Sequence, residues 1–226
     1  MLTLVLAEAE VELLPRELLN HPSVIAHARQ RGKPPERILL DSNYHHAAMK
    51  DLPEGRRRGR PDITHLFLLT ALESIVNKKG GLSIIIHTRN NEVIRVDPKT
   101  RIMRNYERFL GLFEQLFEQH VVPDKNPPLL TLQHDVPLCE VLENAHADAV
   151  VAFSKEGTSV SIQTYLKELK KRKKHHILCV IGGFPSGSFH ADMSNLTTEC
   201  LSLYPEMLPA WTVASEILVN YENVFR

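Results

Sequence analysis

The segment Arg60-Pro61-Asp62 places a guanidinium and a carboxylate two residues apart, at the start of an apolar run that predicts a helix. A carboxylate beside an arginine can fix the orientation of the guanidinium, or act as a base that the arginine keeps ionised. An aspartate in this position can also simply cap the helix. Arg60 and Asp62 are therefore the candidate catalytic pair, with helix capping as the open alternative for Asp62.

Two loops have the composition of a ligand pocket. Gly182-Gly183-Phe184-Pro185-Ser186-Gly187 follows a strand predicted at 177–182, and Leu203-Tyr204-Pro205-Glu206-Met207-Leu208 follows one predicted at 200–203. In open parallel sheets, ligands bind beyond the carboxyl ends of the strands, and glycine lets a ligand approach the main chain closely. The second loop mixes apolar side chains with main-chain groups, as an adenine slot would. Together the loops favour a cofactor pocket over ordinary turns.

Positive charge is concentrated in the middle of a chain that is neutral overall, with 27 basic and 27 acidic side chains. Residues 56–108 hold twelve basic and five acidic side chains, a net charge of +7, and nine of the twelve are arginines. Such a cluster is the electrostatic footprint of a polyanion such as RNA or DNA, whose phosphates the arginine fork matches well. A solvated basic face is the alternative. The run at 170–174 ends a predicted helix and is interpreted as a solvated helix end.

Several other site classes are excluded by their absent signatures. The sequence contains no GxxxxGK[ST], GxGxxG, HExxH or GxSxG pattern. Its twelve histidines and three cysteines have no metal-ligand spacing, so no metal site is predicted. The separated cysteines are typical of a reducing compartment, and no signal peptide or membrane span is recognisable. A cytoplasmic protein without a membrane partner is expected.

These candidate residues need a scaffold, and the apolar patterning predicts an α/β fold with a largely parallel sheet. Strands are predicted at 2–7, 37–41, 129–132, 149–153, 177–182 and 200–203, and helices at 15–31, 42–51, 135–145, 159–175 and 208–224. A helix at 62–77 and a hairpin at 82–87 and 92–96 interrupt this alternation, so residues 55–97 are interpreted as an inserted basic extension.

Asp97-Pro98 then predicts the start of a helix that runs to about residue 120. On that helix Arg101, Arg104 and Arg108 would share the face opposite the apolar side chains. We therefore expect these three arginines to contact the polyanion.

The motifs taken together resemble a known family. Arg60-Pro-Asp-Ile-Thr-His65, Thr100-Arg-Ile-Met-Arg-Asn-Tyr-Glu-Arg-Phe109, Ile181-Gly-Gly-Phe-Pro-Ser-Gly187 and the segment Leu203 to Ser215 resemble the nucleolar essential protein family of ribosome-biogenesis pseudouridine methyltransferases. The similarity covers nearly the whole chain. It implies a single SPOUT-class domain over residues 1–226, with a C-terminal trefoil knot that binds S-adenosylmethionine, and an archaeal member of the family.

The resemblance also implies a function: a homodimer that uses no metal and methylates N1 of a pseudouridine in small-subunit (16S) ribosomal RNA. A non-catalytic rRNA-binding assembly factor is the alternative. One departure is Met103, where proline is expected. Carried over by motif, Asp62 would steady Arg60, RNA would contact Arg60, Arg101, Arg104 and Arg108, and the cofactor would contact Gly182, Gly187, Leu203, Tyr204, Pro205, Glu206, Met207 and Leu208.

Overall fold

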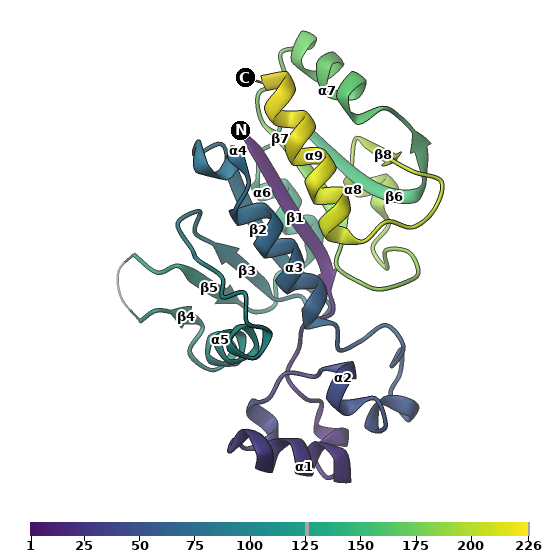
Figure 1. Ribbon diagram of the computed structural model, residues 1–226. Helices are drawn as coiled ribbons and strands as arrows, with labels where there is room; N and C mark the ends of the chain where they lie inside the picture. The colour runs from purple at the N-terminus through teal and green to yellow at the C-terminus, as the bar shows by residue number, and fades with distance from the viewer. Residues whose placement is uncertain (125–126, 226) are drawn as a thin grey trace.

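The computed structural model describes residues 1–124 and 127–225. Within them the strands form one eight-stranded sheet in the order β4-β5-β3-β2-β1-β7-β6-β8 (Figure 1). The strands β2, β1, β7, β6 and β8 are parallel, and β3, β5 and β4 add an antiparallel edge. The strand bounds are β1 Leu2–Ala9, β2 Leu82–Thr88, β3 Val93–Val96, β4 Val121–Val122, β5 Leu130–Gln133, β6 Ala149–Ser159, β7 Ile177–Gly182 and β8 Glu199–Ser202. The predicted α/β class with a largely parallel sheet is confirmed.

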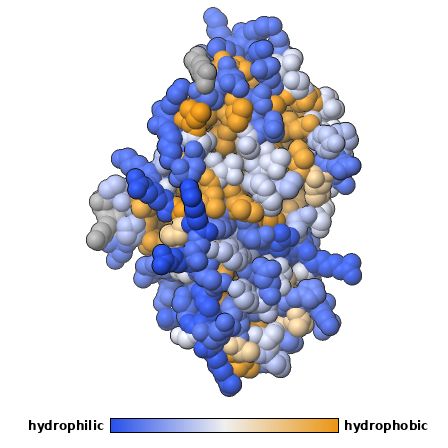
Figure 2. Space-filling view, in the orientation of Figure 1, coloured by the Kyte–Doolittle hydropathy of each residue, from blue (hydrophilic) through white to orange (hydrophobic). Residues whose placement is uncertain are grey.

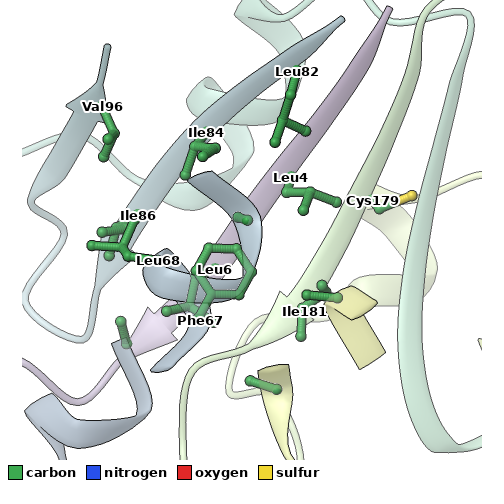
Figure 3. Close-up of a cluster of buried hydrophobic side chains, with 14 of the residues drawn as sticks. Leu4, Leu6, Phe67, Leu68, Leu82, Ile84, Ile86, Val96, Cys179 and Ile181 are labelled. Atoms are coloured by element: carbon green, nitrogen blue, oxygen red, sulfur yellow. The ribbon is translucent and has the colours of Figure 1, made fainter. Parts of the chain in front are cut away.

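Helices cover both faces of this sheet because alternate strand residues point to opposite sides. Leu4 and Leu6 of β1 pack beneath Phe67 of α3, as Figure 3 shows, whereas Val5 and Ala7 face the other side. The first face carries α3 (Pro61–Leu72), α4 (Ile75–Lys78), α5 (Tyr106–Gln119), α7 (Ile162–Lys171) and α9 (Ala210–Phe225). The second carries α6 (Leu138–Asn144) and α8 (Met193–Leu196). The central strand β1 is buried along its whole length, as a strand covered on both faces must be.

A small lobe projects from the carboxyl end of β1 (Figure 1). It spans residues 11–60, has its own apolar cluster around Val24, Leu40 and Met49, and pairs Leu13 with Leu39 through a single bridge. The predicted strand at 37–41 is therefore wrong: these residues are apolar because they are buried in the lobe. The lobe's helices are α1 (Pro22–Arg31) and α2 (Ser42–His45), with short 3₁₀ turns at Arg16–Leu18, Pro35–Arg37 and Ala48–Asp51.

Residues 55–97 are not an appendage of the sheet. The expected hairpin is present, but β2 pairs with β1 and β3 pairs with β5, so both strands lie inside the sheet. Their apolar runs belong to the main core, and α3 covers them on one face (Figure 3). The segment that projects is instead the lobe at 11–60.

The helix predicted with Asp97 as its N-cap begins eight residues later, with Asn105 as its N-cap. Asp97 accepts a hydrogen bond from the Lys99 backbone and forms a local turn, and Thr100 is buried with its hydroxyl donating to the Leu129 carbonyl. The chain then stays irregular until Asn105, whose side chain accepts from the Arg108 N–H and caps α5. Arg101 and Arg104 therefore precede the helix, and the shared helical face predicted for them is wrong.

No helix among the described residues has both the length and the apolar character needed to cross a membrane.

Candidate functional site

A pocket lies where β7 and β8 end, beside the middle of β6, at the carboxyl edge of the parallel strands. This is where an open parallel sheet places ligands. Its walls are apolar, formed by side chains such as Phe153, Phe184 and Val213. Both predicted loops line it, contributing Gly182, Gly187, Leu203, Tyr204, Glu206, Met207 and Leu208. Of the residues predicted to hold the cofactor, Pro205 does not line the pocket.

Two glycines shape this pocket. A Cβ atom added at Gly182 would lie 2.6 Å from the Phe184 ring, so a side chain there would push the ring out of place. Gly187 has a φ of +87°, which disfavours any residue with a side chain. Gly182 thus makes room for the Phe184 ring, and Gly187 allows the left-handed turn of the loop.

A buried arginine from a distant segment holds the glycine loop. The Arg57 guanidinium lies 3.7 Å from the centre of the Phe184 ring and donates a 2.7 Å hydrogen bond to the Ser188 carbonyl. It also pairs with Glu8 at 2.6 Å and with Glu10 at 2.9 Å. Because Arg57 is only 8% exposed, these contacts are shielded from solvent and fix the loop against the end of β1.

Arg60 and Asp62 form the pair that their spacing suggests. Nε and Nη2 of Arg60 donate to the two carboxylate oxygens of Asp62 at 2.8 and 2.7 Å, a bidentate geometry. The hydrogen bonds that Arg60 donates to Asp62 raise the pKa of Arg60. Arg60 itself is the N-cap residue of α3, and Asp62 makes no capping hydrogen bond. Asp62 therefore orients the guanidinium, and the capping alternative is wrong.

Three further arginines surround the N-terminus of α5, which lies beside the N-terminal half of α3 (Figure 1). Arg101, Arg104 and Arg108 are all exposed. Within the described part of the chain, no carboxylate lies within ion-pair distance of any of the three. Their charge is available to an anionic ligand even though no regular helix arranges them.

Part of the positive charge counted in residues 56–108 is neutralised inside the molecule. Arg57 is buried against two glutamates, Arg58 makes a bidentate pair with Glu12, and Arg89 pairs with Glu10 and Glu54. Arg57 ties the lobe to the end of β1, Arg89 joins the hairpin to Glu10 and to the lobe, and Arg58 is paired within the lobe. The polyanion interpretation therefore rests on the exposed arginines and on Arg60, not on the whole segment.

The lysine run at 170–174 is an exposed helix end, as predicted. Lys170 donates to the Val224 carbonyl at 2.6 Å, and Lys171 pairs with Glu168 within α7. Among residues 1–124 and 127–225, no group of three or more His, Cys, Asp or Glu side chains is placed to hold a metal ion.

The sequence prediction missed two groups of site residues, one that lines the pocket and one that supports it. Phe153, Ser154 and Lys155 line the pocket from the middle of β6, where the predicted strand ends. The rule that ligands bind at strand ends could have identified them. Arg57 carried no such signal, because its partners come from β1 and from a loop more than 120 residues away.

Comparisons with known proteins agree with this geometry. The family model described as EMG1/NEP1 methyltransferase matches residues 4–222. A "Ribosomal RNA small subunit methyltransferase Nep1" of Thermococcus sibiricus is 49% identical over 223 residues, covering 99% of this chain and 98% of the relative. The protein of the same name from Methanothrix thermoacetophila is 47% identical over 223 residues, with coverages of 99% and 96%. The crystal structure of Archaeoglobus fulgidus Nep1 bound to S-adenosylhomocysteine is 35% identical, with a TM-score of 0.86 and coverages of 99% and 98%.

Proposed function

The chain belongs to the EMG1/NEP1 methyltransferase family, and from this premise we propose that it transfers a methyl group from S-adenosylmethionine to N1 of a pseudouridine in small-subunit ribosomal RNA. The activity and cofactor follow from the family and from relatives that are named small-subunit rRNA methyltransferases. The choice of N1 of pseudouridine is the finer part of the proposal.

The observation that carries the proposal is the loop 57–60. Its first residue, Arg57, packs on the pocket residue Phe184, and its last residue, Arg60, carries a partly exposed guanidinium fixed by Asp62. One short loop thus connects the apolar pocket to a cationic side chain. A group-transfer enzyme needs this proximity, because donor and acceptor must be held together for the reaction.

The pocket residues fit S-adenosylmethionine. The absence of a side chain at Gly182 makes room for the Phe184 ring in the pocket wall, and the apolar walls suit the faces of an adenine ring. We propose that Gly182, Gly187 and the loop from Leu203 to Leu208 hold the cofactor. When bound, S-adenosylmethionine supplies an electrophilic sulfonium methyl group.

The chain's own groups act on the acceptor base. Pseudouridine is joined to its sugar through carbon, so its N1 carries a proton and becomes a nucleophile when that proton leaves. The positive charge of Arg60 near the base would favour the deprotonated form. Both oxygens of Asp62 already accept hydrogen bonds from Arg60, which favours the orienting role of Asp62 over that of a base. The N1 proton then passes to solvent.

The exposed arginines provide the RNA-binding surface in this proposal. Arg60, Arg101, Arg104 and Arg108 would contact phosphates or bases, since they come from the adjacent N-termini of α3 and α5 and three of them have no carboxylate partner among the described residues. Arginine is suited to both kinds of contact.

We also propose that the whole chain acts as one SPOUT domain with a C-terminal trefoil knot. The support is the close passage of two segments: a Cβ at Gly157 in β6 would lie 2.5 Å from the Leu201 backbone in β8. From β8 the chain returns across the sheet as α9, which packs against α3 and α7. A cytoplasmic location stays a prediction.

A homodimer is proposed from the apolar face of α3, α4 and α9. Figure 2 shows hydrophobic residues gathered over this part of the surface. Leu66, Ile75 and Val219 are 39%, 56% and 57% exposed, and a hollow between these helices is lined by Leu69, Ile75 and Val219. An exposed apolar patch of this kind marks an interaction site, and we assign it to a second copy of the chain.

The function is tested with two small-subunit rRNA transcripts of the same sequence, one made with uridine and one with pseudouridine. Each is incubated with the protein and S-adenosylmethionine, and the modified nucleotide is mapped by mass spectrometry. We expect methylation at N1 in the pseudouridine transcript and none in the uridine transcript. The Arg60→Ala variant should lose methylation while binding the cofactor normally, since Arg60 does not line the pocket.

Two outcomes would contradict parts of the proposal. Equal methylation of both transcripts, or methylation at another atom, would exclude the N1 assignment while leaving a methyltransferase. Tight RNA binding without S-adenosylmethionine binding, measured by calorimetric titration, would instead favour the alternative of a non-catalytic assembly factor.

A further inference from the structure

The arginine surface is the group Arg60, Arg101, Arg104 and Arg108. His65 is a buried residue of α3 that neither lines the pocket nor belongs to this surface. It is 5% exposed, and its Nε2 atom donates a 2.7 Å hydrogen bond to the carbonyl oxygen of Met103. The ring stacks on Phe109 at a centroid distance of 4.4 Å and lies 5.6 Å from the Tyr106 ring. The imidazole therefore sits between α3 and the first turn of α5, with its donor aimed at the segment that precedes α5.

That segment has few other polar restraints, and its apolar contact with the main core is made by Ile102. It is anchored at one end by Thr100, whose hydroxyl donates to the Leu129 carbonyl, and at the other by the Asn105 cap of α5. Among the residues that the structure describes, the bond from His65 is the only hydrogen bond to residues 101–104. It lies between Arg101 and Arg104, and it joins their backbone to α3, the helix that follows Arg60.

We propose that His65 is a positioning residue for RNA binding: its Nε2–H fixes the backbone that carries Arg101 and Arg104 at a set distance from Arg60. This inference rests on the proposed function, because it assumes that these arginines bind RNA. Without the tether, the two arginines would have to be ordered at the moment of binding, and that ordering would reduce the affinity.

The hydrogen bond uses a backbone carbonyl and so does not depend on the side chain at position 103. Methionine and proline both supply this acceptor. The departure at Met103 from the expected proline therefore leaves the tether intact. The donor is also retained in both protonation states of His65, since the Nε2-protonated neutral ring and the charged ring each carry this N–H.

The test compares two substitutions at one position. His65→Phe retains a ring that can stack on Phe109 but removes the donor, whereas His65→Gln retains an N–H donor at a similar reach. Dissociation constants are measured for small-subunit rRNA and, separately, for S-adenosylmethionine. We expect His65→Phe to weaken RNA binding about tenfold, the upper range for one lost hydrogen bond, and His65→Gln to stay within about twofold of the wild type. Cofactor affinity should not change in either variant.

Repeating His65→Phe in an Arg101→Ala/Arg104→Ala background distinguishes the positioning role of His65 from a purely structural one. If His65 acts through these arginines, its substitution should cost little further RNA affinity there. An equal loss in both backgrounds would overturn the inference, as would wild-type RNA affinity of His65→Phe alone. If the arginine double variant itself binds RNA normally, the RNA role of these arginines fails and this inference fails with it. Loss in the arginine variant without loss in His65→Phe overturns this inference alone.

Discussion

Arg57 and Arg60 lie three residues apart but in different surroundings. Arg57 is buried among Glu8, Glu10 and the Phe184 ring, so removing it would leave Glu8 without its ion-pair partner and Glu10 with Arg89 alone. The Arg60 side chain is 30% exposed and paired only with Asp62 among the described residues. The same residue type therefore supports the pocket at one position and, in our proposal, contacts the RNA at the other.

At the residue scale, Gly182 allows a direct test of the pocket. A side chain there would collide with the Phe184 ring, which is itself held under Arg57. We expect Gly182→Val to lower S-adenosylmethionine affinity by one to two orders of magnitude, since overpacking of this kind costs about 1–3 kcal/mol. Calorimetric titration measures the affinity. Gly111→Val in α5 is the matched control, because a Cβ at Gly111 meets nothing within 4 Å. Unchanged affinity of a folded Gly182→Val protein would exclude this pocket as the cofactor site.

At the scale of elements, the lobe is held to α5 by polar contacts. The Tyr106 hydroxyl donates to Asp41 at 2.6 Å, Tyr44 donates to Glu107 at 2.5 Å, and Arg31 pairs with Glu114 at 3.0 Å. Burial is the main reason that the pKa of Asp41 is raised, and the bond from Tyr106 partly offsets it. Because α5 also carries Arg108, these contacts make the lobe a support for the arginine surface.

Inside the lobe, two buried histidines share one hydrogen bond. The Asp41 backbone donates to His45 Nδ1, so the neutral His45 ring carries its proton on Nε2 and donates to His27 Nδ1 at 2.9 Å. Burial, and secondarily the neighbouring His27, lowers the pKa of His45 to about 4. Burial also lowers the pKa of His27. Both rings are therefore neutral in the folded protein at neutral pH.

This pair predicts that acid destabilises the protein. Below the unfolded pKa of about 6.5, the unfolded chain binds protons that the folded chain does not, so the free energy of unfolding falls as the pH decreases toward 4. We expect His45 to account for about 2 kcal/mol between pH 7.5 and 5.0. Asp41, whose pKa is raised, opposes this effect at the acid end of the range.

Urea unfolding at the two pH values measures the effect. His45→Asn should reduce the pH dependence whatever its effect on stability at neutral pH, whereas the matched change at the exposed neighbour His46 should leave it unaltered. The same pH dependence in wild type and His45→Asn would show that His45 is not the group responsible.

At the scale of the whole molecule, the apolar face of α3, α4 and α9 predicts the oligomeric state. On the C-terminal helix α9, Val213, Ile217 and Leu218 are buried within the chain. Val219 on the same helix is exposed. The interface is therefore expected to combine Val219 with Leu66 and Ile75 from the neighbouring helices. Light scattering should report twice the 25.7 kDa of one chain.

The substitution pair Ile75→Asp/Val219→Asp should convert the dimer to a monomer, because it places charges in the apolar contact. Ala26→Asp, on the exposed surface of α1, is the control and should remain dimeric. A wild-type monomer at micromolar concentration would exclude the homodimer.

Local patterns in the sequence determined most strands of the sheet, the pocket loops and one side-chain pair. The apolar runs predicted most strands of the sheet, the glycine loop and the loop from Leu203 to Leu208 predicted the pocket, and the spacing of Arg60 and Asp62 predicted their pairing. Each of these features depends on residues that are close together in the chain, where periodicity and turn chemistry operate.

Tertiary structure alone decided the features that depend on distant segments. In the sequence, nothing distinguishes Arg57 from its exposed neighbour Arg56. Arg57 is buried and holds the glycine loop because the fold brings Glu8 and Ser188 into contact with it. The start of α5 moved from Asp97 to Asn105 because Thr100 is tied to Leu129. Capping signals and hydrophobic periodicity are local, whereas ion pairs and buried hydrogen bonds join residues that only the folded chain brings together.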